Sequence, residues 1–151
     1  MRRLILATAI LAVPGLALAQ QVPADTQVER VTLAPGETSS FTLAPGIDHQ
    51  LLKAAAPGAK GAITIRYDAA GGKSTVTAES RTGYPTTFSV LADPDGDGGF
   101  EAVGEIRLAG DGTAASRSWP QALGTINVGD FAGGPHGGED HQVSGEAPAG
   151  R

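Results

Sequence analysis

Short runs in which apolar and polar residues alternate, each ending at a turn-forming cluster, recur along most of this sequence. In residues 62–68, Ile63, Ile65 and Tyr67 alternate with Thr64, Arg66 and Asp68, so one face of an extended chain would be apolar. A period of two is typical of a β-strand with one buried face. Equivalent runs occupy residues 28–33, 39–43, 73–79, 86–92, 100–108 and 125–128. The chain is therefore predicted to consist mainly of short strands.

Glycine, proline and aspartate separate these runs at intervals of about 10 residues, a spacing found in sandwiches and small barrels. The turn clusters include residues 34–36, 44–46, 70–72, 95–98 and 110–112. We therefore expect an all-β fold over residues 27–130. The predicted architecture is a small antiparallel β-sandwich of about seven to nine short strands, similar in size to an immunoglobulin domain.

Two segments lead to finer expectations. Residues 49–56 (HQLLKAAA) fit either a short helix or a strand that begins at Ile47, and the sequence leaves both interpretations open. In residues 100–108, strict alternation places Phe100, Ala102 and Ile106 on one apolar face. We therefore expect Phe100 to be buried with that face.

The first residues have the three parts of a secretory signal peptide. Met1-Arg2-Arg3 is positively charged, residues 4–13 are apolar, and Ala17-Leu18-Ala19 supplies small residues for cleavage. The apolar stretch is shorter than the roughly 20 residues that span a bilayer. We expect residues 1–19 to be removed, residues 20–26 to form a flexible arm, and the protein to be periplasmic or secreted in a bacterium. Residues 131–151 are glycine-rich and are expected to form a disordered tail.

Charge and size exclude several classes of function. Without residues 1–19 the chain has 9 basic and 16 acidic residues, a net charge of −7, which argues against nucleic acid or an anionic membrane as the main partner. The chain has no cysteine, no G-x-S-x-G or H-E-x-x-H motif and no P-loop. We therefore expect a protein that is not an enzyme and that has no membrane span after the signal.

The most informative stretch is acidic. Asp93, Asp95 and Asp97 occupy alternate positions and are followed by Gly98 and Gly99. Alternate carboxylates can converge on one centre while glycine permits a sharp turn, and carboxylate oxygens are the ligands that Ca²⁺ prefers. The same residue types are also common in exposed hairpin turns. The sequence therefore leaves two interpretations, a calcium loop and a solvated turn.

Residues 93–101 resemble the strand–loop–strand calcium loops of repeat propellers, which have the pattern D-x-D-x-D-G-x-x-D. The resemblance implies carboxylate ligands from Asp93, Asp95 and Asp97, a carbonyl ligand from Gly99 and a final carboxylate from Glu101. The final residue departs from the pattern, because Glu replaces Asp. The resemblance covers nine residues and implies nothing about the overall fold, and calcium is the one cofactor that it suggests.

Two further groups of residues are candidates for binding. The ring of Trp119 fits either sugar stacking or packing in the core or at its rim, and core or rim packing is the more common role of a lone Trp after a short polar strand. The loop that contains Arg81 and Tyr84 is a candidate for ligand contact. The segment from His136 to His141 combines imidazoles with the carboxylates of Glu139 and Asp140. Its glycine-rich flanks favour a solvated tail over a metal site.

These observations favour an exported, non-catalytic binding or accessory module of the envelope or extracellular space, with an envelope protein or a glycan as its partner. Loops at one end of the sandwich would form the binding surface. One alternative is an assembly protein that pairs through its edge strands. Another is a small envelope hydrolase, because the chain has many carboxylates from which an acid–base pair could be drawn.

Overall fold

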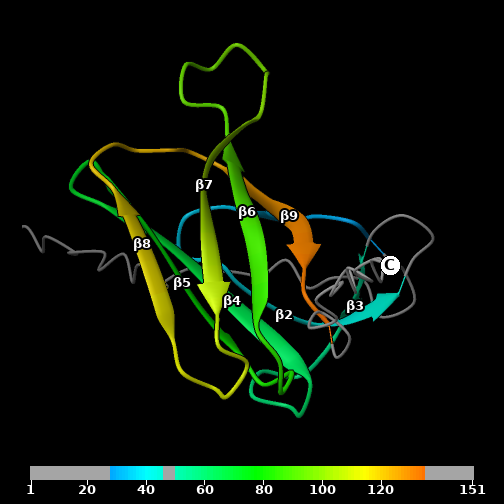
Figure 1. The fold of residues 1–151 in the computed structure, drawn as a ribbon. Helices are drawn as coiled ribbons and strands as arrows, with labels where there is room; N and C mark the ends of the chain where they lie inside the picture. Colours follow the sequence, from blue (N-terminus) through cyan, green and yellow to red (C-terminus); the bar gives the residue numbers. More distant parts are fainter. Residues whose placement is uncertain (1–27, 46–49, 135–151) are drawn as a thin grey trace, which may run out of the picture.

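The computed structural model describes residues 28–45 and 50–134, and the regular elements in these residues are nine β-strands with no helix (Figure 1). The strands form two antiparallel sheets packed face to face, so the predicted β-sandwich is confirmed. They are β1 (Val31–Leu33), β2 (Thr38–Pro45), β3 (Gln50–Ala54), β4 (Ala62–Ala70), β5 (Lys73–Ser80), β6 (Thr86–Ala92), β7 (Glu101–Leu108), β8 (Ala115–Trp119) and β9 (Ile126–Ala132).

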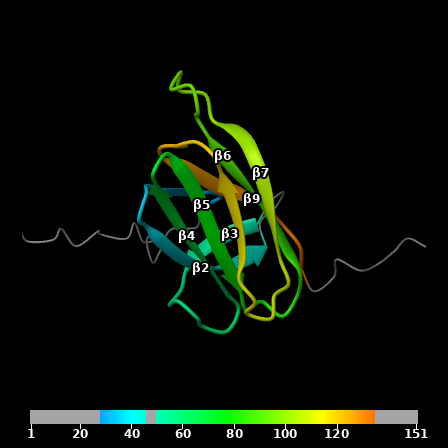
Figure 2. The ribbon, with the colours of Figure 1, turned by 90° about the vertical axis from the view of Figure 1, so that its left-hand side faces the viewer.

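One sheet has the strand order β1-β9-β6-β7 and the other has the order β3-β2-β4-β5-β8 (Figure 2). The alternation seen in the sequence sets the core: Ile63, Ile65 and Tyr67 of β4 are fully buried between the sheets, as predicted. Across the core, the rings of Phe41 and Phe131 meet edge to face at 5.3 Å. Apolar side chains from both sheets therefore fill one continuous core.

The ambiguous segment near residue 50 is a strand, so the helix interpretation is wrong. β3 pairs antiparallel with β2, with Leu52 opposite Leu43 and Ala54 opposite Phe41. Leu52 is fully buried. Pairing along β2 and burial of Leu52 outweigh the helix propensity of the alanines that follow.

The sandwich extends past residue 130, where we expected it to end. β9 continues to Ala132, and Phe131 is a buried core residue whose ring stacks at 5.4 Å on that of Phe88. The single aromatic residue at the start of a glycine-rich segment therefore belongs to the domain. The other expectations for the chain ends, residues 1–26 and 135–151 with His136 to His141, lie outside the described residues, as does His49.

A β-bulge in the pairing of β6 with β7 changes which residues face the core. Val90 lies opposite Gly104, but the next pair is Leu91 with Ala102, so Val103 is an extra residue on β7. The extra residue reverses the alternation beyond it. Phe100 is exposed as a result, which contradicts the expectation of burial, and Ala102 is exposed too.

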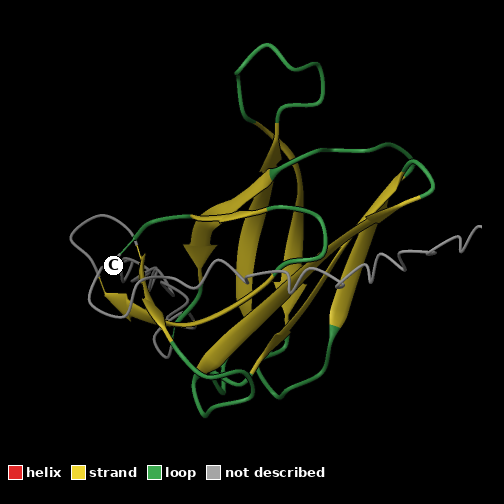
Figure 3. Cartoon of the chain, turned by 180° about the vertical axis from the view of Figure 1, so that it is seen from behind, coloured by secondary structure: helices red, strands yellow, loops and turns green. Residues whose placement is uncertain are grey.

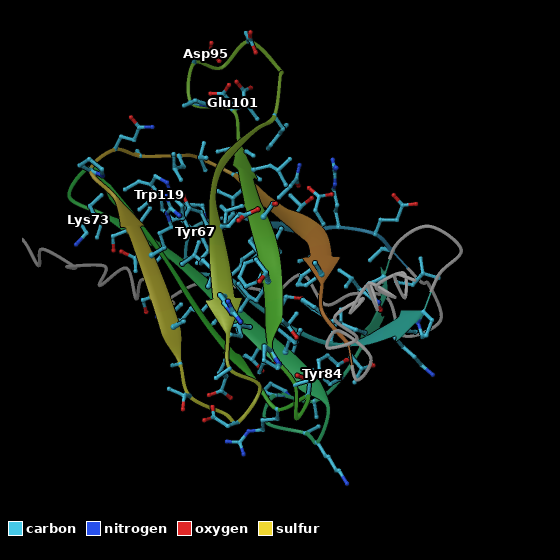
Figure 4. The ribbon with its side chains drawn as sticks, in the orientation of Figure 1. Tyr67, Lys73, Tyr84, Asp95, Glu101 and Trp119 are labelled. Atoms are coloured by element: carbon cyan, nitrogen blue, oxygen red, sulfur yellow. The ribbon has the colours of Figure 1, made fainter. Side chains whose placement is uncertain are left out.

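The connecting loops lie at the two ends of the sandwich. The loop between β6 and β7, residues 93–100, projects beyond the body of the domain, as Figure 3 shows from behind. Tyr84, in the loop between β5 and β6, lies at the opposite end from Asp95 (Figure 4). Tyr84 and the acidic loop therefore do not form one surface.

Candidate functional site

The acidic loop begins and ends at the last paired residues of a hairpin. Ala92 of β6 lies opposite Glu101 of β7, and residues 93–100 connect them. β6 pairs with β9 on its other side and is buried at Val90, Leu91 and Ala92. The loop therefore projects from a rigid, well-packed base.

Asp93 organises the turn. Its Oδ1 accepts hydrogen bonds from the backbone N–H groups of Gly96 (2.9 Å) and Asp97 (3.1 Å), and its Oδ2 accepts one from Gly98 (2.8 Å). The Gly98 N–H is the largest influence that lowers the pKa of the Asp93 carboxyl, because these bonds favour the charged form. One carboxylate thus satisfies three backbone donors of the loop.

Asp97 supports the second half of the loop. Its Oδ1 accepts a 2.7 Å hydrogen bond from the N–H of Gly99. A Cβ on Gly99 would lie 2.9 Å from that same oxygen, closer than a real Cβ approaches. A side chain at position 99 would therefore require the Asp97 carboxylate to shift.

Three carboxylates converge at the tip. Asp93, Asp95 and Asp97 each offer an oxygen, and these oxygens all lie within 4.8 Å of one another. A calcium ion holds its ligands at 2.3–2.6 Å, so two oxygens on opposite sides of one ion are up to about 5 Å apart. The spacing and the hard oxygen donors therefore fit a shared divalent cation.

Glu101 does not belong to this group, although the resemblance placed it as the last ligand. It is the first residue of β7, exposed and held opposite Ala92 by strand pairing. The structure thus brings together three of the four predicted carboxylates. Calcium takes six to eight oxygen ligands, so water and carbonyl groups such as that of Gly99 would have to supply the remainder.

Phe100 is the residue of this loop whose exposure the sequence pattern did not predict. It is 42% exposed and is the one large apolar side chain left exposed in the described part of the chain. It lies between Gly99 and Glu101, at the end of an acidic loop. Only the register shift at Val103 reveals its exposure, and a bulge leaves no clear mark in the sequence.

Trp119 packs in the core, which confirms one of its two interpretations and excludes an exposed platform for sugar stacking. Its side chain is 8% exposed and packs in the core, and its indole N–H donates a 3.1 Å hydrogen bond to the carbonyl of Val103. The indole therefore joins β8 of one sheet to β7 of the other.

Tyr84 lies at the far end of the sandwich from the acidic loop (Figure 4), and Arg81 is in the same connection between β5 and β6. The Arg81 guanidinium faces Glu79 at 3.9 Å, and the two side chains are 50% and 35% exposed, so solvent screens the ion pair and it contributes little stability. Tyr84 is half-buried, and its carbonyl accepts a 2.8 Å hydrogen bond from the hydroxyl of Thr82. These contacts hold the loop but do not by themselves form a binding site.

The chain matches no protein-family model, and neither curated proteins nor solved structures give a significant match. Among residues 28–45 and 50–134, no helix has the length and apolar character needed to cross a bilayer. The candidate site is therefore defined by its own geometry: a projecting hairpin with three convergent carboxylates and one exposed phenyl ring.

Proposed function

We propose that this protein is an exported, non-catalytic binding or accessory module of the bacterial envelope or extracellular space, and that it binds its partner with the β6–β7 hairpin tip. The observation that carries the proposal is the exposure of Phe100 on a loop that projects from a rigid sandwich. Exposed aromatic rings on a rigid support are favourable contact residues, because they bury a large area and lose little side-chain entropy.

The surroundings of Phe100 indicate the chemistry of the partner. Asp95 and Asp97 are exposed nearby in the same loop, and Glu101 follows Phe100 directly. The partner would present an apolar patch or a sugar ring to the phenyl group and cationic groups to the carboxylates. Envelope glycans cross-linked by peptides, and envelope proteins with basic surfaces, both offer such features.

Calcium has a structural part in this proposal. A cation shared by Asp93, Asp95 and Asp97 would reduce the repulsion between their charges and hold the tip beside Phe100 in one conformation. The resemblance of residues 93–101 to known calcium loops and the 4.8 Å spacing of the carboxylates support this role. A site with a dissociation constant of roughly 10⁻⁴–10⁻³ M would be filled in an extracellular setting.

Co-sedimentation with purified peptidoglycan tests the binding role. We expect the wild-type chain to pellet with the insoluble glycan and the Phe100→Ser variant to remain in the supernatant. Tyr84→Ser, which changes an aromatic residue at the opposite end, is the matched control and should pellet like the wild type. Loss of binding in Tyr84→Ser alone would place the binding surface at the end of the sandwich opposite the acidic loop and refute the proposal. Release of soluble sugar fragments would show that the protein is a hydrolase.

Thermal unfolding with EDTA or with millimolar calcium tests the ion. At a calcium concentration of about ten times the dissociation constant, calcium adds about 1.4 kcal/mol, which is a rise in Tm of roughly 6 °C for a domain of this size. Asp95→Asn with Asp97→Asn should abolish the rise. Asp111→Asn, in an unrelated turn, should keep it, and an unchanged wild-type Tm would refute the calcium role.

A further inference from the structure

A sandwich has two sides at which the edge strand of one sheet faces the edge strand of the other. In this domain the two sides are covered in different ways. On the side of β1 and β3, the backbone closes the gap: Val28 forms an antiparallel bridge with Leu52 of β3, through hydrogen bonds of 3.3 and 2.8 Å. The same segment then continues into β1, which pairs with β9 in the other sheet. One strand segment thus covers both edges on this side.

On the other side, β7 and β8 are the terminal strands of the two sheets and lie next to each other (Figure 2). Two side chains of β8 close this gap. Arg117 Nη1 donates a 3.1 Å hydrogen bond to the carbonyl of Glu105, and Trp119 Nε1 donates one of 3.1 Å to the carbonyl of Val103. We call these two side chains the Arg117–Trp119 clamp.

The clamp fits closely against β7. A Cβ on Gly104 would lie 2.6 Å from Cζ and Nε of Arg117, so the guanidinium occupies the space that any other residue at position 104 would fill. The Arg117 guanidinium also lies 5.7 Å from the centre of the Trp119 ring, within the range of a cation–π contact. Gly104 therefore provides the space in which the Arg117 guanidinium packs beside Trp119.

The two carbonyls that the clamp holds belong to the free edge of β7. β7 pairs with β6 on one side and has no strand paired on the other, and the side chains of β8 reach the carbonyls of Val103 and Glu105. β7 is an eight-residue terminal strand. Exposed strand edges of this length are templates for pairing with another chain unless something covers them.

We propose that the Arg117–Trp119 clamp keeps the β7 edge closed, and that the occupant it excludes is β7 of a second copy of this chain. The segment 104–108 can pair antiparallel with itself about a two-fold axis at Ile106. That register sets Glu105 of each copy opposite Arg107 of the other, and both side chains are exposed. Opposite charges directly across an antiparallel pair stabilise it, and a self-complementary edge gives a closed dimer.

Sedimentation velocity of the purified chain tests the proposal. Arg117→Met keeps the side-chain stem without its donors, and Trp119→Phe keeps an aromatic ring without the indole N–H. We expect the wild type to be monomeric at high micromolar concentration and the double variant to form a dimer. A wild-type dimer, or a double variant that stays monomeric with an unchanged circular dichroism spectrum, would overturn the proposal.

Charge reversal on β7 distinguishes pairing through the strand edge from nonspecific association. In the clamp double variant, Glu105→Arg sets arginine against Arg107 and should abolish the dimer, whereas Glu105→Arg with Arg107→Glu should restore it. Association that persists in Glu105→Arg would mean that exposed core, and not the β7 edge, drives it. If the double variant does not fold, the same series in Arg117→Met alone gives the answer, because the Trp119 packing remains.

Discussion

The buried hydroxyl of Ser74 accepts a 3.0 Å hydrogen bond from the backbone N–H of Leu123, a residue 49 positions further along the chain. The hydroxyl of Tyr67 lies 3.2 Å from the same serine oxygen. Ser74 is in β5, Tyr67 in β4 and Leu123 in the connection from β8 to β9. One small polar group therefore fixes the long connection that crosses between the sheets.

Ser74→Ala should lower the free energy of unfolding by about 1–3 kcal/mol, because the buried Leu123 N–H loses its acceptor. Urea denaturation measures the change. Ser39→Ala is the matched control: Ser39 is also buried, but its hydroxyl has no hydrogen-bond partner among the described residues. Its removal should leave stability unchanged or slightly raised. Equal losses in the two variants would contradict the assignment.

Gly110 and Gly36 form a second matched pair, since both have a φ of +88°. A Cβ at Gly36 meets nothing within 4 Å, whereas a Cβ at Gly110 would overlap the backbone carbonyl of Tyr84. Gly36→Ala should therefore cost about 1 kcal/mol from backbone strain alone. Gly110→Ala should cost at least about 3 kcal/mol, because backbone cannot move aside as a side chain can. Thermal or urea unfolding of the two variants gives the comparison.

Gly104→Ala tests the fit between β7 and Arg117. In the wild type the new methyl group should displace the guanidinium and cost about 1 kcal/mol for the lost bond to Glu105. In an Arg117→Ala background the same change should be neutral or stabilising, since alanine suits a strand better than glycine. A double-mutant cycle from urea denaturation measures this coupling. Additive effects would show that Arg117 does not rest on Gly104 in solution.

Asp93 should make stability depend on pH. Its folded-state pKa lies below the ordinary value, chiefly through the N–H of Gly98. The contribution of the charged form is therefore present above the unfolded-state pKa of about 4 and is lost as pH falls through the lower folded-state pKa. The stability difference between wild type and Asp93→Ala should be largest near neutral pH and shrink in acid. A difference that grows on acidification would refute the role of Asp93 in the turn.

Asp111, in the connection between β7 and β8, is a second carboxylate that should make stability depend on pH. Its Oδ1 accepts a 2.8 Å hydrogen bond from the N–H of Thr113, which lowers the pKa of the carboxyl. Asp111→Ala should therefore show the same sign of pH dependence as Asp93→Ala. Guanidinium denaturation of both variants at neutral and acidic pH provides the measurement.

The sequence predicted those parts of the fold that depend on local pattern. Ile63, Ile65 and Tyr67 face the core because their alternation continues through one uninterrupted strand. Phe100 could not be placed in the same way, because one extra residue at Val103 reverses the pattern beyond it. A bulge depends on the partner strand as much as on the residues that form it.

The candidate site also has parts that the sequence predicts and parts that it does not. The convergence of Asp93, Asp95 and Asp97 was predictable, because neighbours in a tight turn can meet only in a few ways. Glu101 is held away by the ladder of the hairpin, and the indole of Trp119 is taken up by a carbonyl 16 positions earlier. Strand pairing within one sheet sets the position of Glu101, and a hydrogen bond between the sheets sets that of Trp119. The spacing of the residues along the chain encodes neither.

The three hydrogen bonds accepted by Asp93 have a consequence for how the hairpin tip meets a partner. Because these bonds restrict residues 96–98 before a partner arrives, the tip loses less conformational entropy when it binds than an unrestrained loop would. The hairpin tip would then bind its partner without first having to fold. The association rate would be set by diffusion and by the orientation of the two molecules.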